Sequence, residues 1–263
     1  MSKRVQTMAE MAASDTVPEV LFWVGCAGSF DDRYKRVTKA FASILSEIGI
    51  NFAVLGDEES CTGDPARRAG NEFLFQMQAL MNIQTLNGYA IKKIVTACPH
   101  CFNTLKNEYP ALGGTYEVVH HTEYLQQLIQ EGKLRLKEGE VFKGKKITFH
   151  DSCYLGRVNG VYEAPREILE ALDADLIEMK RCKTKGLCCG AGGGQMFKEP
   201  EKGDKDVNIE RIEDALATGA QTIAVSCPFC MVMMTDGLKN KEKEDQVVVK
   251  DIAELVFEQL NAK

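Results

Sequence analysis

The ten cysteines of this chain are not scattered, because eight of them form four pairs at a nearly constant spacing. The spacing is 127, 128, 129 and 129 residues for the pairs Cys26/Cys153, Cys61/Cys189, Cys98/Cys227 and Cys101/Cys230. The surrounding text agrees, since IVTACPHC in one half matches IAVSCPFC in the other. Unrelated segments would not stay in step through so many landmarks. The sequence therefore predicts two homologous domains, residues 18–138 and 139–263, after a disordered tail of residues 1–17.

Each half alternates short β-rich runs with amphipathic stretches, which is typical of a parallel sheet flanked by helices. The predicted strands are EVLFWVG, INFAVLG, KKIVTAC and YEVVHH in the first half and KKITFHD, ADLIEMK, QTIAVSC and QVVVKD in the second. We therefore predict an α/β fold of two pseudo-symmetric repeats, each a small parallel sheet flanked by helices. Nearly all the paired cysteines fall at, or just past, the carboxyl ends of these strands. Open α/β sheets bind ligands at that edge, so cysteines distant in sequence can converge there.

The composition is that of an ordinary globular protein, with 44% hydrophobic residues. A net charge of −6 without a long basic block argues against a nucleic-acid partner, because phosphate binding needs a clustered positive face. No run approaches the roughly 18 apolar residues of a spanning helix, and the polar start MSKRVQTMAE lacks the apolar centre of a signal peptide. We expect a cytoplasmic protein that meets a membrane only through a partner. In that reducing compartment, cysteines are more often metal ligands or catalytic thiols than disulfides.

Each half contains a C-x-x-C sequence directly after a predicted strand. We expect Cys98 and Cys227 to cap the helices that follow, with Pro99 and Pro228 at the first helical position. The free N–H groups and the dipole of such a helix start favour negative charge on sulfur, as a thiolate-bound metal requires. A C-x-x-C alone fits a thioredoxin-like redox pair or half of a zinc site equally well. The further cysteines at strand ends favour a metal centre.

The second half carries five such cysteines, which is one more than a zinc ion takes: Cys153, Cys188, Cys189, Cys227 and Cys230. A cluster with several irons can use all five. The glycines after the adjacent pair let the backbone approach a bulky cofactor, and they are Gly190, Gly192, Gly193 and Gly194. A nucleotide-binding loop is a weak alternative for this segment, because no G-K-[ST] follows and no strand immediately precedes it.

The pattern C…CCG…CPFC, repeated with this spacing, resembles the cysteine-rich CCG domain found in the B-type component of heterodisulfide reductase and in related iron-sulfur proteins of glycolate and lactate oxidation. The resemblance covers the chain beyond residue 18. It implies a noncubane [4Fe-4S] centre held by all five second-half cysteines. The segments SCTGDPARRAGNE and HDSCYLGRVNGVYEAPREIL look closest to heterodisulfide-reductase-like proteins, which pass electrons between an electron-transferring flavoprotein or thiol/disulfide couples and quinone.

The first half departs from the pattern, because Ser60 stands where the first cysteine of the adjacent pair would be. Four cysteines remain there: Cys26, Cys61, Cys98 and Cys101. Four thiolates suit a cubane [4Fe-4S] cluster or a tetrahedral zinc ion by count. We favour the cluster, because the setting at the sheet edge repeats that of the second half. A hydroxyl ligand from Ser60 is the lesser alternative.

Two residues near the second-half cysteines have ambiguous roles. His150, three residues before Cys153, is expected to donate a hydrogen bond to a cluster sulfur or to supply protons, and a cap of the strand end is an equal alternative. Cys182 lies outside both patterns, and we expect a free, partly buried thiol.

Polar residues near the first-half cysteines are expected to be structural or to face outward. His120 and His121 follow a strand and are expected to have structural roles, whereas His100 is expected to point to solvent or a partner. Arg67 is expected to offset the charge of a metal centre or to grip Asp64, and a simple salt bridge that orders the loop is an equal alternative.

The function predicted from these features is that of an iron-sulfur subunit of a heterodisulfide-reductase-like oxidoreductase complex. The second-half centre would relay single electrons or cleave a disulfide in two one-electron steps. No flavin, nicotinamide or haem site is visible, so electrons must arrive from a ferredoxin-like or flavoprotein partner, and the chain is not expected to be a complete enzyme alone. The alternatives are an iron-sulfur subunit of a lactate or glycolate oxidation complex and a non-catalytic zinc scaffold.

Overall fold

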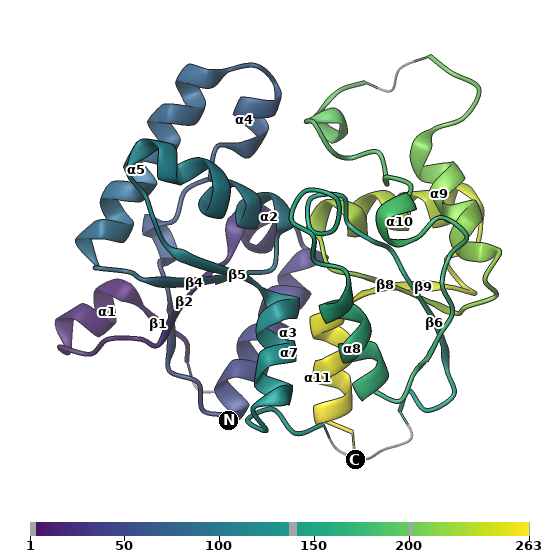
Figure 1. The fold of residues 1–263 in the computed structure, drawn as a ribbon, viewed down its shortest axis with the longest axis horizontal. Coiled ribbons are helices and arrows are strands. Elements are labelled where there is room, and N and C mark those ends of the chain that lie inside the picture. The colour runs from purple at the N-terminus through teal and green to yellow at the C-terminus, as the bar shows by residue number, and fades with distance from the viewer. Residues whose placement is uncertain (1–3, 137–140, 200–201, 263) are drawn as a thin grey trace. The chain divides into compact units, whose positions relative to one another are not determined.

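The computed structural model describes residues 4–136, 141–199 and 202–262, and it comprises two compact α/β units. They divide between Tyr124 and Leu125, within one helix (Figure 1). The predicted boundary between residues 138 and 139 lies outside the described residues.

The first unit is built on a five-stranded parallel sheet with the strand order β1-β3-β2-β4-β5. Its strands are β1 (Gln6–Thr7), β2 (Val20–Trp23), β3 (Phe52–Val54), β4 (Lys93–Thr96) and β5 (Glu117–His120). Its helices are α1 (Met8–Ala13), α2 (Gly25–Phe30), α3 (Tyr34–Glu47), α4 (Asp64–Arg68), α5 (Glu72–Gly88) and α6 (Pro99–Asn103), and α7 (His121–Gln130) leads into the second unit. Short turns of 3₁₀ or π type are η1 (Gly56–Glu58), η2 (Thr104–Glu108) and η3 (Tyr109–Leu112).

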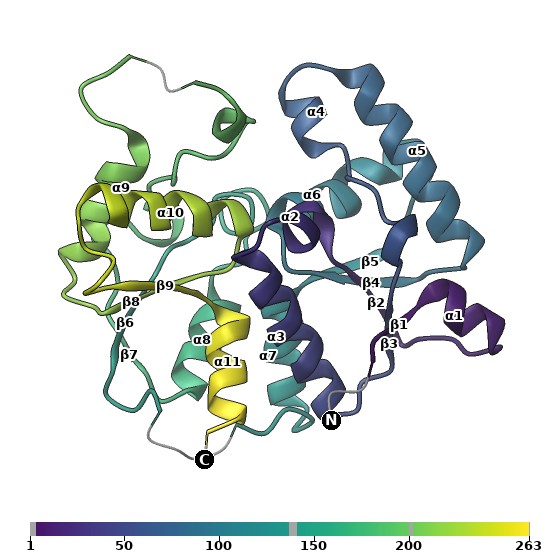
Figure 2. The same ribbon diagram turned by 180° about the vertical axis from the view of Figure 1, so that it is seen from behind.

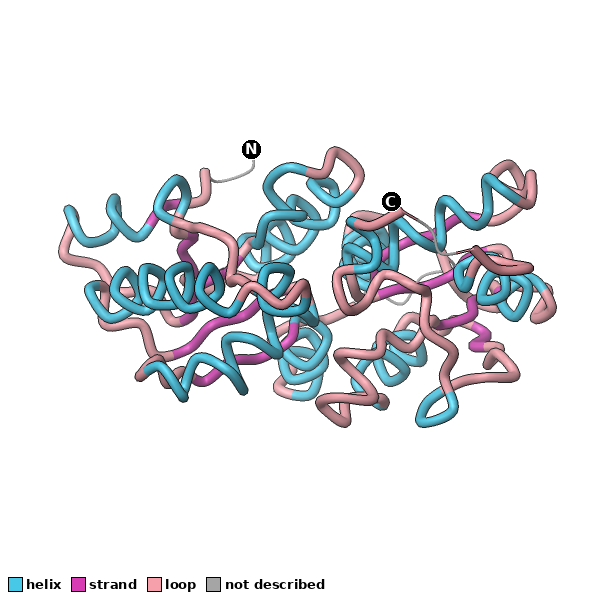
Figure 3. Tube along the Cα trace, turned by 90° about the horizontal axis from the view of Figure 1, so that it is seen from above, coloured by secondary structure: helices cyan, strands magenta, loops and turns pink. Residues whose placement is uncertain are grey.

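The second unit is built on a four-stranded parallel sheet with the strand order β7-β6-β8-β9. Its strands are β6 (Lys146–Phe149), β7 (Asp175–Leu176), β8 (Thr222–Val225) and β9 (Val248–Asp251). Its helices are α8 (Glu163–Ala171), α9 (Val207–Leu216), α10 (Pro228–Asn240) and α11 (Ile252–Leu260), with 3₁₀ turns η4 (Lys183–Lys185) and η5 (Gln195–Phe197). The described residues between β7 and α9 are otherwise mostly loop, and loops are drawn pink in Figure 3.

The two sheets share one topology, which confirms the prediction of a repeated α/β fold. Without β1, each sheet runs second strand, first strand, third strand, fourth strand in chain order. The register also repeats, because Phe22 pairs with Val95 in the first sheet and Phe149 pairs with Ala224 in the second. Positions 127 residues apart on the first strand of each repeat are therefore structurally equivalent.

Helices lie on both faces of each sheet, as expected for parallel strands. In the second unit, α9 and α10 lie on one face and α8 and α11 on the other, in both opposite views (Figures 1 and 2). The central strands are consequently apolar almost throughout, and all four residues of β2 are buried. Because these strands are buried on both faces, their carboxyl ends, where the cysteine-bearing loops begin, are held in fixed positions.

The N-terminal segment is structured from residue 6, so the prediction of a disordered tail is wrong there. Thr7 and Glu10 form a capping box at the start of α1, and Met8 and Met11 are buried. Strand β1 pairs in parallel with β3. The polar composition of this segment concealed the two methionines that anchor it.

Helix α5 exposes an unusually apolar face. Five large apolar residues on it are 41–76% exposed: Phe73, Leu74, Met77, Leu80 and Met81. Within the described residues, no helix combines the length and the apolar character needed to cross a membrane.

Candidate metal centres

The C-x-x-C sequences lie where the sequence predicts them, at the turn from a strand into a helix. Cys98 is the N-cap of α6 with Pro99 in its first turn, and Cys227 is the N-cap of α10 with Pro228 in its first turn. The second cysteine of each pair is therefore inside the first turn and, like its N-cap partner, buried. The predicted caps are confirmed.

The structure brings the five cysteines of the second unit into one group. The Sγ atoms of Cys153 and Cys188 lie 4.0 Å apart, and those of Cys189 and Cys230 lie 3.4 Å apart. The pKa of Cys153 is raised because its thiol hydrogen-bonds to Cys188, because it is partly buried, and because the charges of Cys189 and Cys227 lie close by. Thiols gathered this closely can bind a cation as thiolates once their protons are released.

This cysteine group has a closed side and an open side. Cys189, Cys227 and Cys230 are buried, whereas Cys153 and Cys188 are only partly buried. A metal centre held here would be shielded from water on the side of the three buried cysteines and accessible to solvent or a partner on the side of the other two.

The glycine loop lies against the same cysteines. Gly190 has φ +95°, a backbone conformation that other residues rarely adopt, and its N–H donates to the Cys188 sulfur at 3.3 Å. A Cβ atom on Gly192 would lie 3.8 Å from the Cys153 sulfur, whereas Gly193 and Gly194 face open space. Two of the four predicted glycines thus contact the cysteine group.

His150 also lies in the group and is held by a residue that sequence analysis did not single out. Its side chain is 1% exposed, and one ring nitrogen lies within 4.8 Å of the sulfurs of Cys189 and Cys230. Arg211 of α9, itself 0% exposed, donates from Nε to His150 Nδ1 at 2.9 Å. Burial and the charge of Arg211 lower the pKa of His150 to about 3, so the ring is neutral.

The four cysteines of the first unit form a similar group with one sulfur fewer. The pKa of Cys26 is raised because its thiol hydrogen-bonds to Cys61, because of burial, and because Cys61 and Cys98 are nearby charges. The pKa of Cys101 is raised by Cys98, by burial, and by the charges of Cys26 and Cys61. A Cβ atom on Gly25, which has φ +78°, would lie 3.3 Å from the Cys101 sulfur, so this glycine lets the two cysteine segments meet.

Glu59 fixes the turn that carries Cys26 and was not among the predicted residues. Its carboxylate accepts hydrogen bonds from the backbone N–H groups of Val24, at 2.9 Å, and Gly25, at 2.5 Å. Burial raises the pKa of Glu59 to about 7, against the lowering effect of these two N–H groups. Its only sequence signal was its position two residues before Cys61.

Ser60 is engaged in a hydrogen bond that does not involve the cysteines. Its Oγ donates to Asn82 Oδ1 at 2.8 Å, while Asn82 Nδ2 donates to the Cys61 carbonyl and to the Tyr109 hydroxyl. The Tyr109 hydroxyl in turn donates to the Thr62 carbonyl. This arrangement favours four thiolates over four thiolates and a hydroxyl.

Replacing Ser60 with alanine is therefore expected to leave the metal content of the first unit unchanged. The hydroxyl supports a loop hydrogen bond, so the expected cost is confined to about 1 kcal/mol of stability. Metal analysis of Ser60→Ala, with Cys61→Ser as the matched ligand variant, checks this. Metal loss in both variants would instead make Ser60 a ligand.

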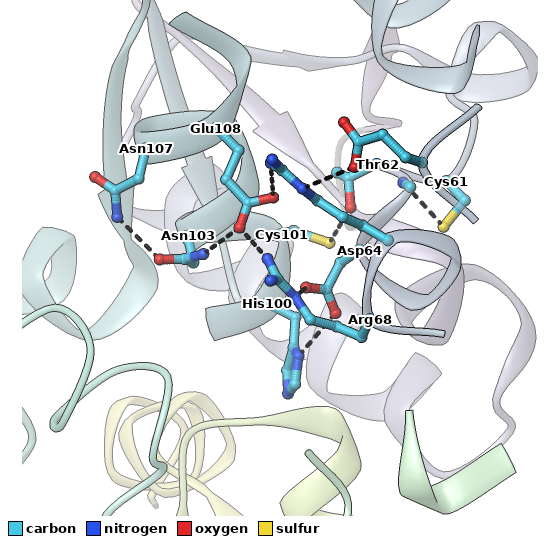
Figure 4. Close-up of polar contacts among 12 residues, drawn as sticks. Cys61, Thr62, Asp64, Arg68, His100, Cys101, Asn103, Asn107 and Glu108 are labelled. Carbon is cyan, nitrogen blue, oxygen red and sulfur yellow. Dashed lines mark hydrogen bonds and ion pairs between the residues drawn. The ribbon is translucent and has the colours of Figure 1, made fainter. Parts of the chain in front are cut away.

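A polar network flanks the first-unit cysteines (Figure 4). It corrects the prediction for His100 and decides between the alternatives for Arg67, which forms salt bridges with Glu72 and Glu108. His100 is buried and its Nδ1 lies 3.0 Å from Asp64 Oδ2, so it does not point to solvent. Arg68, and not Arg67, contacts Asp64, at 3.0 Å, because residues four apart share a face of α4. Both arginines also contact Glu108, at the end of η2.

The remaining predicted residues lie apart from these contacts. His120 and His121 are fully buried and contact each other and Thr122, with 2.8 Å between His120 Nδ1 and Thr122 Oγ1. Cys182 is partly buried, as expected, and its pKa is raised by burial and by the charges of Glu178 and Asp151.

The spacing of the sulfurs bears on the size of the group that each site can hold. Four sulfurs around one zinc ion, each about 2.3 Å from it, would lie about 4 Å from one another. Across the described ranges, the one set of three ligand atoms within 4.8 Å of one another is that of His150, Cys189 and Cys230. The second unit offers one thiol more than a zinc ion takes, and the donor sets of both units fit iron-sulfur clusters.

Comparison with known proteins places the same repeat in a family. The model of a cysteine-rich domain, CCG, matches residues 20–106 and 147–235, one match in each unit. The EtfAB:quinone oxidoreductase of Syntrophomonas wolfei is 46% identical over 245 residues, which cover 91% of this chain and 34% of that protein. The probable iron-sulfur-binding oxidoreductase FadF of Bacillus subtilis is 48% identical, covering 96% of this chain and 35% of that protein.

A third relative comes from an archaeon. The D-type component of the dihydromethanophenazine:CoB–CoM heterodisulfide reductase of Methanosarcina barkeri is 36% identical over 251 residues, which cover 92% of this chain and 59% of that component. The chain thus spans about a third of the length of the two bacterial relatives and under two thirds of the archaeal one.

Proposed function

The chain belongs to the family of the cysteine-rich CCG domain, and we propose that it is an iron-sulfur electron-transfer subunit of a heterodisulfide-reductase-like oxidoreductase complex. The observation that carries the proposal is the gathering of five thiols in the second unit, with a buried imidazole beside them. One zinc ion would leave at least one of these thiols unused.

In the second unit we assign a noncubane [4Fe-4S] cluster to Cys153, Cys188, Cys189, Cys227 and Cys230. Such a cluster, when bound, takes up and gives back single electrons. The chain itself supplies the thiolates, the buried wall formed by Cys189, Cys227 and Cys230, and the open side at Cys153 and Cys188. The open side is where a partner or a disulfide substrate would reach the centre.

In the first unit we assign a cubane [4Fe-4S] cluster to Cys26, Cys61, Cys98 and Cys101. Two observations support a cluster held by four thiolates: the Ser60 hydroxyl donates to Asn82, and the C-x-x-C helix start repeats that of the second unit. A centre here extends the path by which electrons enter or leave the chain.

The electron donor and acceptor are assigned to partner proteins. The relative from Syntrophomonas wolfei is an oxidoreductase of EtfAB and quinone, and this chain corresponds to only about a third of it. We propose that an electron-transferring flavoprotein supplies electrons here as well, and that a partner subunit contributes what the longer relatives carry on one chain. We assign the apolar face of α5 to the partner subunit, because no charged residue lies between Phe73 and Gly88.

Placing two charges on this face should break the complex. In the double variant Met77→Glu/Leu80→Glu, affinity for the partner subunit is expected to fall at least about tenfold, since charges replace apolar side chains at the contact. Size-exclusion chromatography of the co-expressed subunits measures this, with circular dichroism to verify folding. Gln84→Glu adds a charge to the same helix without removing apolar surface and serves as the control. Equal loss in both variants, or in neither, would contradict docking on this face.

Iron, zinc and acid-labile sulfide contents of protein purified without oxygen test the proposed function. About eight irons per chain are expected, with an electron paramagnetic resonance signal on reduction. About four irons and one zinc would confine electron transfer to the second unit. Zinc without iron or sulfide would overturn the proposal and leave a structural scaffold. If lactate or glycolate reduces the chain through a partner, and an electron-transferring flavoprotein does not, the chain belongs instead to a 2-hydroxy-acid oxidation complex.

A further inference from the structure

Each unit has a buried aromatic residue with a ring nitrogen at the same strand-end position, three residues before its first cysteine. His150 in the second unit and Trp23 in the first lie three residues before the first cysteine of their group, 127 residues apart. Trp23 pairs with Thr96, two residues before Cys98, and the backbone N–H of His150 donates to the carbonyl of Ala224, three residues before Cys227. The register of the sheets therefore makes the two positions equivalent.

Both rings are buried, and each has a nitrogen without a hydrogen-bond partner in the part of the chain that the structure describes. Trp23 is 0% exposed and His150 is 1% exposed. Within the described residues, neither Trp23 Nε1 nor His150 Nε2 has a hydrogen-bond partner. A buried donor left unsatisfied costs about 1–3 kcal/mol, so its repetition in both units indicates acceptors that belong to the filled sites.

Arg211 decides the role of His150. A guanidinium only donates, so the Arg211 contact requires a lone pair on His150 Nδ1. The proton of the neutral ring is then on Nε2, which makes Nε2 a donor. A histidine that binds a metal through Nε2 instead donates from Nδ1 to an acceptor. His150 is consequently suited to donate to sulfur and unsuited to ligate iron.

Arg211 is itself held in the position from which it donates to His150. Its Nη1 donates to the Arg181 carbonyl at 2.7 Å and lies 3.4 Å from Asp214 Oδ2. Arg181 binds the same Asp214 carboxylate but has no hydrogen bond to His150 among those described. The pair of arginines thus offers a variant and a matched control.

We propose that Trp23 Nε1 and His150 Nε2 are equivalent hydrogen-bond donors to the sulfur atoms of the two metal centres, and that Arg211 is a positioning residue that keeps the His150 proton on Nε2. This inference rests on the proposed clusters. A donor to cluster sulfur stabilises the more negative, reduced state, and therefore raises the reduction potential.

The reduction potential of the second-unit centre tests the His150 part, by titration of the full reconstituted chain followed by paramagnetic resonance. His150→Leu is expected to lower the reduced-to-oxidised ratio about tenfold at a fixed ambient potential, the effect of one hydrogen bond to a charged acceptor and a shift of about 59 mV for one electron. His150→Gln retains an N–H donor and should recover most of it. A potential unchanged in His150→Leu, in a protein with full iron content, would overturn the inference while leaving the proposed function intact.

Arg211→Met tests the positioning role. In electron–nuclear double resonance, the coupling of an exchangeable proton to the centre should weaken in this variant and persist in Arg181→Gln. Protein labelled with ¹⁵N-histidine should show the weak coupling of a donor, and a strong coupling typical of an iron ligand would refute the assignment. Wild-type protein without iron would remove the proposed function and this inference together.

Trp23 is the single tryptophan of the chain, so its indole N–H gives one nuclear magnetic resonance cross-peak. In Cys189→Ser protein, which retains the first-unit cysteines, this cross-peak is expected to shift or broaden when iron and sulfide are added. It should remain unchanged in Cys189→Ser/Cys98→Ser. An indole signal indifferent to loading of the first unit would show that Trp23 is not a donor to that centre.

Discussion

Replacing Cys189 with serine is expected to remove about four of the eight irons proposed for the chain, together with the visible absorption of the second-unit centre. Cys189 is buried, and its sulfur lies 3.4 Å from that of Cys230. A serine hydroxyl stays protonated where a thiolate is needed, and its hard oxygen is a poor ligand for iron in this setting. Four remaining cysteines would then have to hold a group arranged for five.

Cys182→Ser is the matched control for this experiment. Cys182 belongs to the same unit and is partly buried, but it is outside the repeated cysteine pattern. Its replacement should leave iron content and spectrum unchanged. Equal iron in the Cys189→Ser and wild-type proteins would exclude Cys189 as a ligand, and loss in Cys182→Ser would show that the repeat does not define the site.

Much of the fold was predictable, because the cysteine spacing, the pattern of strands and the C-x-x-C segments all repeat between the two halves. All eight predicted strands are present, since apolar runs closed by glycine or proline leave few other assignments. The helix caps at Cys98 and Cys227 followed from proline at the first helical position. These features are local, and local patterns can be read without knowing what packs against them.

The errors concern side chains whose partners are distant in sequence. His100 turns inward because α4 brings Asp64 to it across 36 residues. Arg211 is a single arginine in an ordinary amphipathic helix, and its partner His150 is 61 residues away. The 127-residue offset did contain a signal for Trp23, because it places an aromatic N–H where the other half has an imidazole. Tryptophan and histidine are dissimilar residues, so their equivalence is less evident in the sequence than that of the cysteines and the C-x-x-C segments.

The ion pair between Arg166 and Asp151 links the stability of the second unit to its cysteine loop. Arg166 Nη1 and Nη2 donate to the two Asp151 oxygens at 2.8 and 3.0 Å, and the two residues are only 7% and 6% exposed. Arg166 also contacts Glu178, at 2.6 Å. Asp151 Oδ2 accepts in addition from the Lys183 backbone N–H at 2.7 Å, in the segment that leads to Cys188.

Arg166→Met is expected to destabilise the second unit by about 3–5 kcal/mol, because it strands a buried carboxylate. Lys183→Gln, which removes an exposed pair with Glu163, should cost about 1 kcal/mol or less. Urea unfolding separates the units, since fluorescence of Trp23 reports the first unit alone while circular dichroism reports both. The dichroism midpoint should fall and the fluorescence midpoint should not. Adding Asp151→Asn should recover part of the loss, and equal costs in Arg166→Met and Lys183→Gln would mean that the buried pair does not support the loop.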